Sequence, residues 1–510
     1  MPTDLRSAYR KLLDINKNLI VLGTSAELIH WDMETMMPPR AVSHRSEQLA
    51  QLSQIHHKLS TSPKIGRLLD VILKDPKYET LSEVEKRNVQ LIKKNYDEQT
   101  KLPTKLVTQL ARQEAITVNV WKKAKAQKNY ALFKPELEKL VALNKQAAEI
   151  LMKVKETKTP YDALVDIFEP KMTSDNITRI FTELRQGLQK LLDKIEGAPN
   201  KPDTNILHKM VPVQQQREIA KMLAATLGYD VSSPNAGGRI DETEHPFTQG
   251  YYDDVRITTH YYPDNFASSV FSVLHETGHA LYDQNLNPEW KYQPIGQACS
   301  HGVHESQSRL YENLIGRSSE FWTSLLPKMK TAAPDTSSID LDPFIRAINT
   351  VKPSKIRIEA DEVTYGMHII IRFQIEKDLF ADKVKVSELP GLWNQKYKEY
   401  LGMNIEDDAE GVMQDTHWAS GYYGYFPSYA LGNIYSGQIL ETIQHENPDW
   451  RNQLAKGNLD SMRQWLTKNI YNAGRLYDPA DLLKKVTGKE PTDKPFLRYL
   501  EEKYSRIYGF

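Results

Sequence analysis

His275 and His279 lie four positions apart in an apolar segment of the chain, Ser272–Tyr282. In a helix this spacing leaves about 40° between the two side chains around the axis, so both imidazoles can face one metal ion. Glu276 is the only charged residue of the segment. Its carboxylate can reach a water bound to the metal rather than the metal itself, as a general base must. The pattern predicts a hydrolytic metal site; the alternative is a pair of hydrogen-bonded core histidines.

A third ligand is needed because catalytic zinc usually takes three protein side chains and leaves a fourth position for water. A third histidine of the extended zincin type would require glycine at 282 and histidine at 285, but the chain has Tyr282 and Asn285. The expected third ligand is Glu305, which opens a second helical run 26 positions after His279. Three other side chains remain as alternatives: Glu312 and Glu359 as ligands, and His304 as a hydrogen-bond partner of a ligand.

Two neutral imidazoles and one carboxylate would leave a bound Zn²⁺ with a net positive charge. Such an ion acidifies its water toward a pKa of about 7 and polarises a peptide carbonyl. Glu276 would take the proton of the water and return it to the leaving amine, which is the chemistry of peptide hydrolysis. Zn²⁺ suits two histidines and a glutamate best, while Co²⁺ and Mn²⁺ remain possible ions for the same set.

The elements that must position these side chains are mainly helical. Apolar residues recur at threes and fours over residues 80–98, 101–127, 130–157 and 174–196. Turn residues, aromatics and an alternating run at Val255–Tyr262 then predict a small antiparallel sheet, and helical pattern resumes near Ala267. We find no long linker, so we expect one helical unit over residues 1–510 with the small sheet beside the histidine-bearing helix.

The composition narrows the class of protein. Lysine plus arginine number 66, as do aspartate plus glutamate, so the chain has no surplus charge that would indicate binding to nucleic acid or anionic lipid. No stretch reaches the roughly 18–20 apolar residues that a membrane span needs, and the first residues do not resemble a signal peptide. The single cysteine, Cys299, cannot form an intrachain disulfide and is expected to be buried. We expect a cytoplasmic protein.

Six further segments of the chain accompany the histidine motif: Trp31–Pro38, His245–Phe247, Asp254–Thr258, His304–Gln307, Ile356–Asp361 and Gly411–Trp418. With the motif, and in this order over essentially the whole chain, they resemble the signature blocks of the carboxypeptidase Taq family, also called thermostable carboxypeptidase 1. The resemblance implies a helical peptidase fold with a deep active-site groove between two halves, related to neurolysin and angiotensin-converting enzyme. It also implies a homodimer and the metal-dependent release of single C-terminal residues with broad specificity.

The resemblance also suggests residues for substrate binding. A carboxypeptidase must bind a free α-carboxylate, and the planar fork of an arginine can pair with it bidentately. Arg357 is the expected residue, with an ion pair to Glu359 or Asp361 as the alternative role. Arg256 is expected to be structural and paired with Asp254.

Donors to the developing oxyanion are also expected. His417 and the tyrosines after it look similar to the histidine and tyrosine that serve this purpose in the helical relatives. Tyr425 is expected to donate to the oxyanion and Tyr422 to touch the substrate. His245 either shapes the substrate groove or braces the turn at Pro246.

Three functions fit these residues. The first is a metallocarboxypeptidase acting on peptides. The second is a metallo-oligopeptidase or endopeptidase on the same scaffold, which would not need the free C-terminus and would therefore cleave C-terminally amidated peptides. The third is a helical protein that binds metal without catalysis, although the presence of Glu276 beside the ligands disfavours it.

Overall fold

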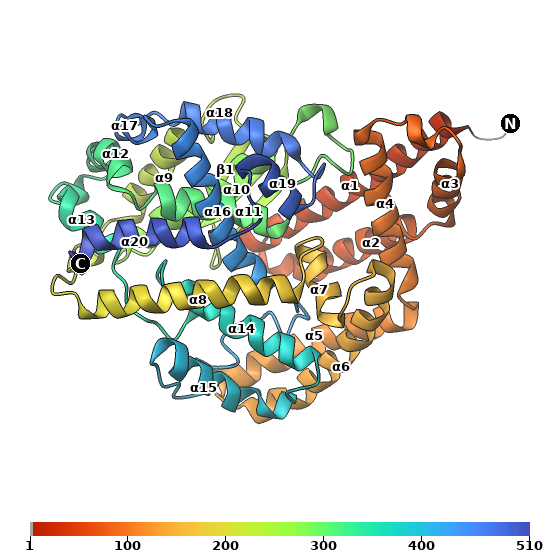
Figure 1. Cartoon of the computed structure of the whole chain (residues 1–510), viewed down its shortest axis with the longest axis horizontal. Coiled ribbons are helices and arrows are strands. Elements are labelled where there is room, and N and C mark those ends of the chain that lie inside the picture. Colours follow the sequence, from red (N-terminus) through yellow and green to blue (C-terminus); the bar gives the residue numbers. More distant parts are fainter. Residues whose placement is uncertain (1–3) are drawn as a thin grey trace.

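The computed structural model describes residues 4–510. Its first part consists of eight helices (Figure 1), with bounds α1 (Leu5–Thr35), α2 (Val42–Ser60), α3 (Pro63–Lys74), α4 (Glu83–Lys101), α5 (Thr104–Ala126), α6 (Tyr130–Lys155), α7 (Pro160–Phe168) and α8 (Ser174–Gly197). Side chains cap several of them. Ser82 and Glu85 form a reciprocal capping box at α4, and Thr159 and Asp162 form another at α7. The four long helices expected from periodicity are confirmed to within a few residues.

A small sheet follows helix α9 (Val213–Leu227) and lies beside helix α10 (Phe266–Gln284). It has the order β1 (Gly238–Glu242), β3 (Asp254–Thr259), β2 (Thr248–Tyr251). β2 pairs antiparallel with β3, but β1 pairs parallel with it. The expectation of an antiparallel sheet was therefore wrong for one of its two pairings. The chain reverses twice between β1 and β3, so the two strands run the same way, and β3 inserts between β1 and β2.

The remaining helices build the larger part of the molecule around α10. They are α11 (His301–Arg309), α12 (Ser319–Ala332), α13 (Leu341–Ile348), α14 (Tyr365–Phe380), α15 (Leu389–Leu401), α16 (Phe426–Glu446), α17 (Trp450–Ala455), α18 (Asp460–Asn469), α19 (Pro479–Thr487) and α20 (Lys494–Tyr508). A π-helical turn, Leu310–Ile315, continues α11 directly. The mainly helical fold class is confirmed.

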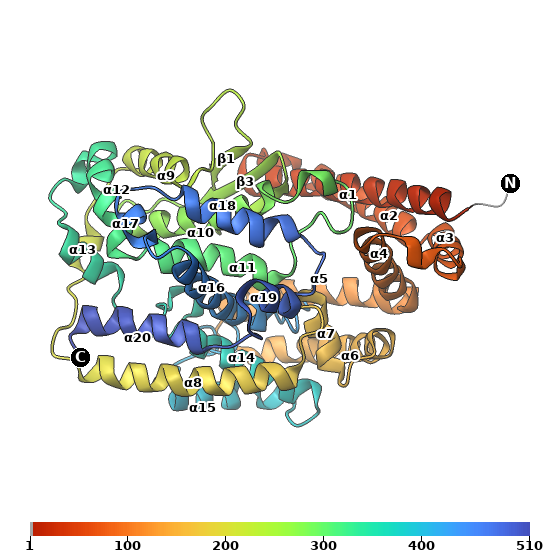
Figure 2. The same ribbon diagram turned by 45° about the horizontal axis from the view of Figure 1, so that its top comes forward.

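Figures 1 and 2 show how the parts are arranged. Helices α1–α4 gather at the end that holds the N-terminus, while α12, α13 and the C-terminus lie at the opposite end. A large buried cluster of apolar side chains spans α5–α20, and a smaller one joins α1, α3 and α4. Helices α10, α11 and α16 belong to the large cluster and pack on one another. The histidine-bearing helix therefore lies in the interior of the larger part.

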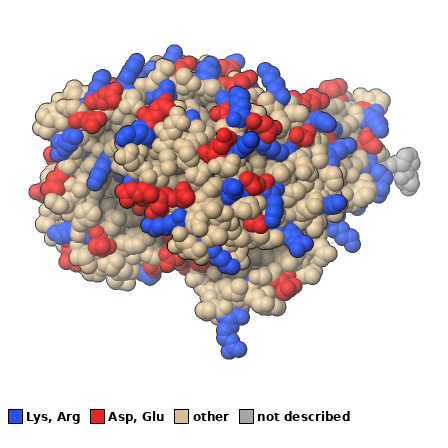
Figure 3. All heavy atoms as spheres, turned by 90° about the horizontal axis from the view of Figure 1, so that it is seen from below, with Lys and Arg blue, Asp and Glu red and all other residues tan. Residues whose placement is uncertain are grey.

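The surface agrees with the balanced composition. On the face shown in Figure 3, basic and acidic residues are interspersed. No helix within residues 4–510 combines the length and the apolar character that a bilayer-spanning segment needs. Cys299 is buried as expected, and Arg256 pairs with Asp254 at 2.7 Å.

Candidate active site

Two closely packed helices carry the expected metal ligands. α10 holds His275 and His279, and α11 holds Glu305. The helices approach closely at Gly278, where an added Cβ would lie only 2.6 Å from the backbone oxygen of Gln307. Glycine is thus required between the two histidines, because any side chain there would push the two helices apart.

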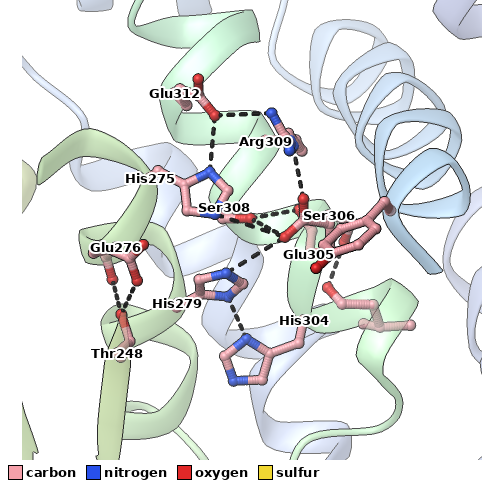
Figure 4. Close-up of polar contacts among 12 residues, drawn as sticks. Thr248, His275, Glu276, His279, His304, Glu305, Ser306, Ser308, Arg309 and Glu312 are labelled. Carbon is pink, nitrogen blue, oxygen red and sulfur yellow. Dashed lines mark hydrogen bonds and ion pairs between the residues drawn. The ribbon is translucent and has the colours of Figure 1, made fainter. Parts of the chain in front are cut away.

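The three side chains converge on one point (Figure 4). Ligand atoms of His275, His279 and Glu305 all lie within 4.8 Å of one another. The Glu305 carboxylate oxygen is 3.7 Å from Nε2 of His275 and 3.4 Å from Nε2 of His279. Ligands bound tetrahedrally at about 2.0–2.2 Å stand about 3.3–3.6 Å apart, so these separations fit an ion such as zinc.

One carboxylate and one further histidine hold the two imidazoles by their other nitrogens. Nδ1 of His275 lies 2.8 Å from Glu312, and Nδ1 of His279 lies 2.5 Å from Nδ1 of His304. Asp283 in turn contacts Nε2 of His304 at 3.2 Å. Such contacts fix ring orientation and leave the Nε2 atoms directed at Glu305.

The other candidates for a third ligand lie in different positions. Glu312, in the π-helical turn after α11, is a partner of His275 rather than a member of the three-residue cluster. Glu359 is exposed, and the cluster found within residues 4–510 includes neither carboxylate. His304 contacts a histidine of the cluster, as its alternative role required.

Arg309 balances the negative charge of the site. Its Nε donates to Glu305 at 2.7 Å, and its Nη1 donates to Glu312 at 3.2 Å. Burial alone would raise the pKa of Glu305, but Arg309 and the two histidines lower it below its usual range. Burial, with His304 nearby, lowers the pKa of His279 to about 3. An ionised carboxylate and a neutral imidazole are the forms that bind metal.

Glu276 points away from this cluster toward the sheet (Figure 4). Its carboxylate is almost fully buried, and the hydroxyl of Thr248 on β2 donates to it at 2.6 Å. Burial raises the pKa of Glu276, while His275 and Thr248 offset part of that rise. A carboxylate beside the ligands, held by a strand residue and free of the metal cluster, has the position that a general base needs.

His417 lies in the segment 402–425, which joins α15 to α16 without helix or strand. Its Nε2 is 3.2 Å from the hydroxyl of Tyr429, and its Nδ1 is buried with no hydrogen-bond partner among residues 4–510. Burial, reinforced by Arg357 and Arg372, lowers the pKa of His417 to about 4, although Asp415 opposes this. This low pKa keeps the imidazole neutral at pH 7.

Arg357 is nearly buried beside the same segment. Nε and Nη2 both donate to Asp415, at 3.0 and 2.8 Å, and Nη1 donates to the hydroxyl of Tyr365 at 3.2 Å. Glu359 and Asp361, the ion-pair partners considered from the sequence, were therefore the wrong ones. Both lie close to Arg357 in sequence, but Glu359 turns outward and Asp361 accepts hydrogen bonds from the Lys352, Val363 and Thr364 backbone.

Tyr425 packs in a cluster of aromatic rings with Phe168, His301 and His417, which we call the aromatic wall. Its ring contacts Phe168, His301 and His417 at centroid distances of 5.0, 5.4 and 5.6 Å. Burial, followed by the negative charge of Glu305, raises the pKa of Tyr425 to about 12, so it keeps its proton. Tyr422 is 55% exposed, with its ring 6.4 Å from Tyr425.

Several contact residues of the site escaped the sequence reasoning. Those that orient the expected residues directly are Thr248, Asp283, Arg309, Asp415 and Tyr429. Arg309 and Asp415 stand inside or next to the recognised blocks and were open to prediction as partners. Thr248 directly follows the block His245–Phe247, and Tyr429 is one of the tyrosines after His417, but neither was assigned a contact. His245 lies exposed on the link between β1 and β2, outside the contacts described above.

Comparison with known proteins decides the family. The family model described as Carboxypeptidase Taq (M32) metallopeptidase matches residues 11–504. The chain belongs to this family. It is 38% identical to carboxypeptidase 1 of Bacillus subtilis over 507 residues and 38% identical to thermostable carboxypeptidase 1 of Thermus thermophilus over 510 residues, with 99% of each chain covered in both cases.

Solved structures of family members have the same fold. The M32 carboxypeptidase of Deinococcus radiodurans matches with a TM-score of 0.94 and 32% identity, covering 99% of this chain and 100% of that one. A Pyrococcus furiosus carboxypeptidase matches with a TM-score of 0.91 and 31% identity, covering 98% and 99%. This member of the carboxypeptidase Taq family is a metal-dependent carboxypeptidase that acts on peptides.

Proposed function

We propose that this carboxypeptidase releases single C-terminal residues with broad specificity, with Zn²⁺ held by His275, His279 and Glu305 and with Glu276 as general base. The observation that carries this proposal is the convergence of three possible ligand atoms. Nε2 of His279 and Nε2 of His275 lie 3.4 and 3.7 Å from the same carboxylate oxygen of Glu305, and the carboxylate of Glu276 points away from them. Two histidines and a carboxylate favour zinc, while Co²⁺ and Mn²⁺ suit the same donors less closely.

The chemistry divides between the ion and the protein. When bound, the cation supplies a Lewis acid that activates water and polarises the scissile carbonyl. Glu276 takes a proton from the attacking water and returns it to the leaving amine, and Thr248 holds its carboxylate in place. The burial that raises the pKa of Glu276 helps it to work in both directions, since it must accept a proton and then release it.

Arg357 is proposed to bind the α-carboxylate of the substrate. A guanidinium has five N–H groups, and three of those on Arg357 are used by Asp415 and Tyr365. One hydrogen remains on each terminal nitrogen, and these two can form the parallel pair of bonds that a carboxylate accepts. Asp415 fixes the guanidinium from its other edge.

His417 and Tyr425 are proposed to donate hydrogen bonds to the developing oxyanion. Tyr425 keeps its proton at neutral pH, and neutral His417 has one buried nitrogen without a partner among residues 4–510. Preorganised neutral donors in a buried site stabilise the negative charge of a transition state. Tyr422, which is exposed beside Tyr425, and His245 are proposed to touch the peptide.

Other features of the proposal follow from the resemblance to the family. We propose a homodimer in the cytoplasm, a single domain over residues 1–510, and a deep groove that admits extended peptides. Light scattering of the purified protein would show twice the mass of the 58.7 kDa chain if the dimer forms.

Matched peptides test the proposed function. The metal-loaded protein is incubated with one peptide as the free acid and as the C-terminal amide, and the products are followed by mass spectrometry. We expect stepwise loss of single residues from the free acid alone. Cleavage inside both peptides would support the oligopeptidase alternative, and bound metal without any cleavage would support the non-catalytic one.

Arginine variants locate the carboxylate contact in the same assay. Arg357→Lys replaces a planar fork by a point charge, so we expect a rise in KM for the free acid of about tenfold or more. Arg498→Lys is the control, because Arg498 pairs with Glu441 at the surface. Equal KM values for the two variants would remove Arg357 from the carboxylate site.

A further inference from the structure

Two proposed active-site residues, His417 and Tyr425, lie in the irregular segment 402–425. A helix fixes its side chains through its own backbone hydrogen bonds, but a loop depends on contacts with other parts of the protein. The contacts that hold this segment therefore decide how well His417 and Tyr425 are placed at the substrate.

One buried carboxylate holds both ends of the part of the loop between them. Glu376 on α14 is 0% exposed. Its Oε1 accepts a hydrogen bond from Nε1 of Trp418 at 2.8 Å, and its Oε2 accepts one from the backbone N–H of Gly424 at 2.9 Å. Trp418 directly follows His417, and Gly424 directly precedes Tyr425. Each anchor point is thus one residue from a proposed oxyanion donor.

Helix α7 contacts the same arrangement. The hydroxyl of Tyr161 donates to Oε2 of Glu376 at 2.8 Å. Gly424 has φ +82, and an added Cβ there would lie 2.7 Å from the backbone of Leu164. α7 and α14 lie side by side in Figures 1 and 2. At Gly424, where Glu376 binds the loop, the loop backbone is therefore in close contact with the backbone of α7.

The cost of burying Glu376 argues against a purely stabilising role. Burial raises the pKa of Glu376 to about 7, and the groups that oppose the rise are chiefly its three hydrogen-bond donors, with the charge of Arg372 a smaller influence. A buried carboxylate without a close cation lowers stability compared with an apolar side chain of similar size. What the carboxylate provides here is a fixed geometry for two separate points of the loop.

We propose that Glu376 is a positioning residue for the reaction. It touches neither metal nor substrate, and its carboxylate holds Trp418 and Gly424 so that His417 and Tyr425 face the reacting carbonyl. This inference rests on the proposed roles of His417 and Tyr425.

Glu169 offers a matched control within the same chain. It is also 0% exposed, and burial raises its pKa to about 7. It accepts hydrogen bonds from the backbone N–H of Gly302 at 3.0 Å, from the hydroxyl of Tyr435 at 2.9 Å and from Ser300. Gly302 and Ser300 are at the start of α11, the helix of Glu305. Glu169 thus holds the metal helix as Glu376 holds the loop.

The test compares Glu376→Gln with Glu169→Gln. Glutamine keeps one oxygen, but its NH₂ group must face either Trp418 or Gly424, which are both donors, so one anchor of the loop is lost. We expect kcat on the free-acid peptide to fall about 10- to 100-fold in Glu376→Gln, as for a misplacement of about 1 Å, with KM and metal affinity nearly unchanged. In Glu169→Gln we expect about tenfold weaker metal affinity and nearly unchanged kcat at saturating metal.

A third variant set shows whether Glu376 acts through the donors. Glu376→Gln is added to the double variant His417→Ala, Tyr425→Phe, where we expect it to lower kcat by less than about threefold, because residues that act as a unit are not additive. If Glu376→Gln lowers kcat as strongly in the double variant as in the wild type, the positioning role is overturned. The same holds if the single variant Glu376→Gln has the wild-type kcat. If His417→Ala and Tyr425→Phe leave kcat unchanged, the result contradicts the proposed oxyanion roles of these two residues, on which the role of Glu376 rests.

A milder variant keeps the test decisive if Glu376→Gln does not fold. Trp418→Phe removes the Nε1 donor but keeps an aromatic ring against Trp393. We expect a smaller fall in kcat of the same kind, with metal affinity unchanged, and wild-type kcat in this variant would contradict the proposal.

Discussion

The metal cluster and the aromatic wall of the active site are built in different ways. His275, His279 and Glu305 stand on two regular helices; the four-residue spacing pairs the histidines, and the close approach of the helices at Gly278 brings Glu305 to them. His417 and Tyr425 stand on a loop, and the contacts that hold this loop come from α16, which follows it, and from α14. Helical positions are specified locally by the sequence, whereas the loop positions are specified by buried polar contacts across the molecule. Changes in the two regions should therefore affect different measurements.

The largest effect is expected from Glu276→Gln. This variant removes the proposed base but none of the three ligands, so kcat should fall by about 10²- to 10⁴-fold. Metal content, measured by mass spectrometry of the dialysed protein, should remain at the wild-type value. Loss of the metal in this variant would mean that Glu276 belongs to the cluster and not beside it.

On the loop side, Tyr425→Phe should lower kcat by about 10²- to 10³-fold, the usual loss for one oxyanion donor. The hydroxyl alone is removed, so the aromatic packing with Phe168 and His301 is retained. Steady-state kinetics with metal-saturated protein measure the effect. Tyr78→Phe, in the connection between α3 and α4, serves as the control, and equal kcat values for both variants would contradict the assignment.

On the metal side, Glu312→Gln should weaken metal affinity by about 10- to 100-fold, because it changes the partner of His275 rather than a ligand. Competition with a chelator of known affinity measures the change. The control is Glu320→Gln, whose carboxylate pairs with Arg451 near the surface. Wild-type affinity in Glu312→Gln would show that the His275 contact does not orient the ring for metal.

The smallest expected effect concerns pH and stability. Glu376 and Glu169 have pKa values raised by burial from 4.5 to about 7, so the folded protein holds protons that the unfolded chain releases. The contribution of this proton binding to the free energy of unfolding is fully present below pH 4.5 and is lost as the pH rises through 7. As the pH rises from 5 to 8, the free energy of unfolding should therefore fall less in Glu376→Gln and in Glu169→Gln than in the wild type.

Midpoints of urea unfolding at pH 5 and at pH 8 measure this change in stability. The difference in unfolding free energy is expected to be on the order of 1–3 kcal/mol for each carboxylate. Glu79→Gln is the exposed control. A pH dependence in both buried variants equal to that of wild type would show that the two carboxylates are ionised already at pH 5.

The same contrast explains what the sequence could predict. Helical periodicity indicated the long helices, and the four-residue spacing of His275 and His279 indicated the metal site with Glu305. The parallel pairing of β1 with β3 was missed because strand order depends on which strand inserts between the others. Asp415 was missed as the partner of Arg357, since 58 residues separate them and no local pattern pairs them.

Buried carboxylates are the hardest group to recognise in the sequence. Glu376 follows the mixed segment Arg372–Ile375 in α14, while Glu169 stands just after α7, and neither position marks a hydrogen-bonding role. The donors to Glu376 come from 42, 48 and 215 residues away, and those to Glu169 include groups 133 and 266 residues away. Only the folded arrangement brings such groups together, so their contacts could not be predicted from the sequence.

The most direct test of the account is to locate the ion. Anomalous diffraction at the zinc edge from crystals of the zinc-loaded protein should give one strong peak about 2.0–2.2 Å from Nε2 of His275, Nε2 of His279 and a carboxylate oxygen of Glu305, with Glu276 outside bonding distance. A peak bound by Glu276 or Glu312 in place of Glu305, or a peak elsewhere in the protein, would contradict it.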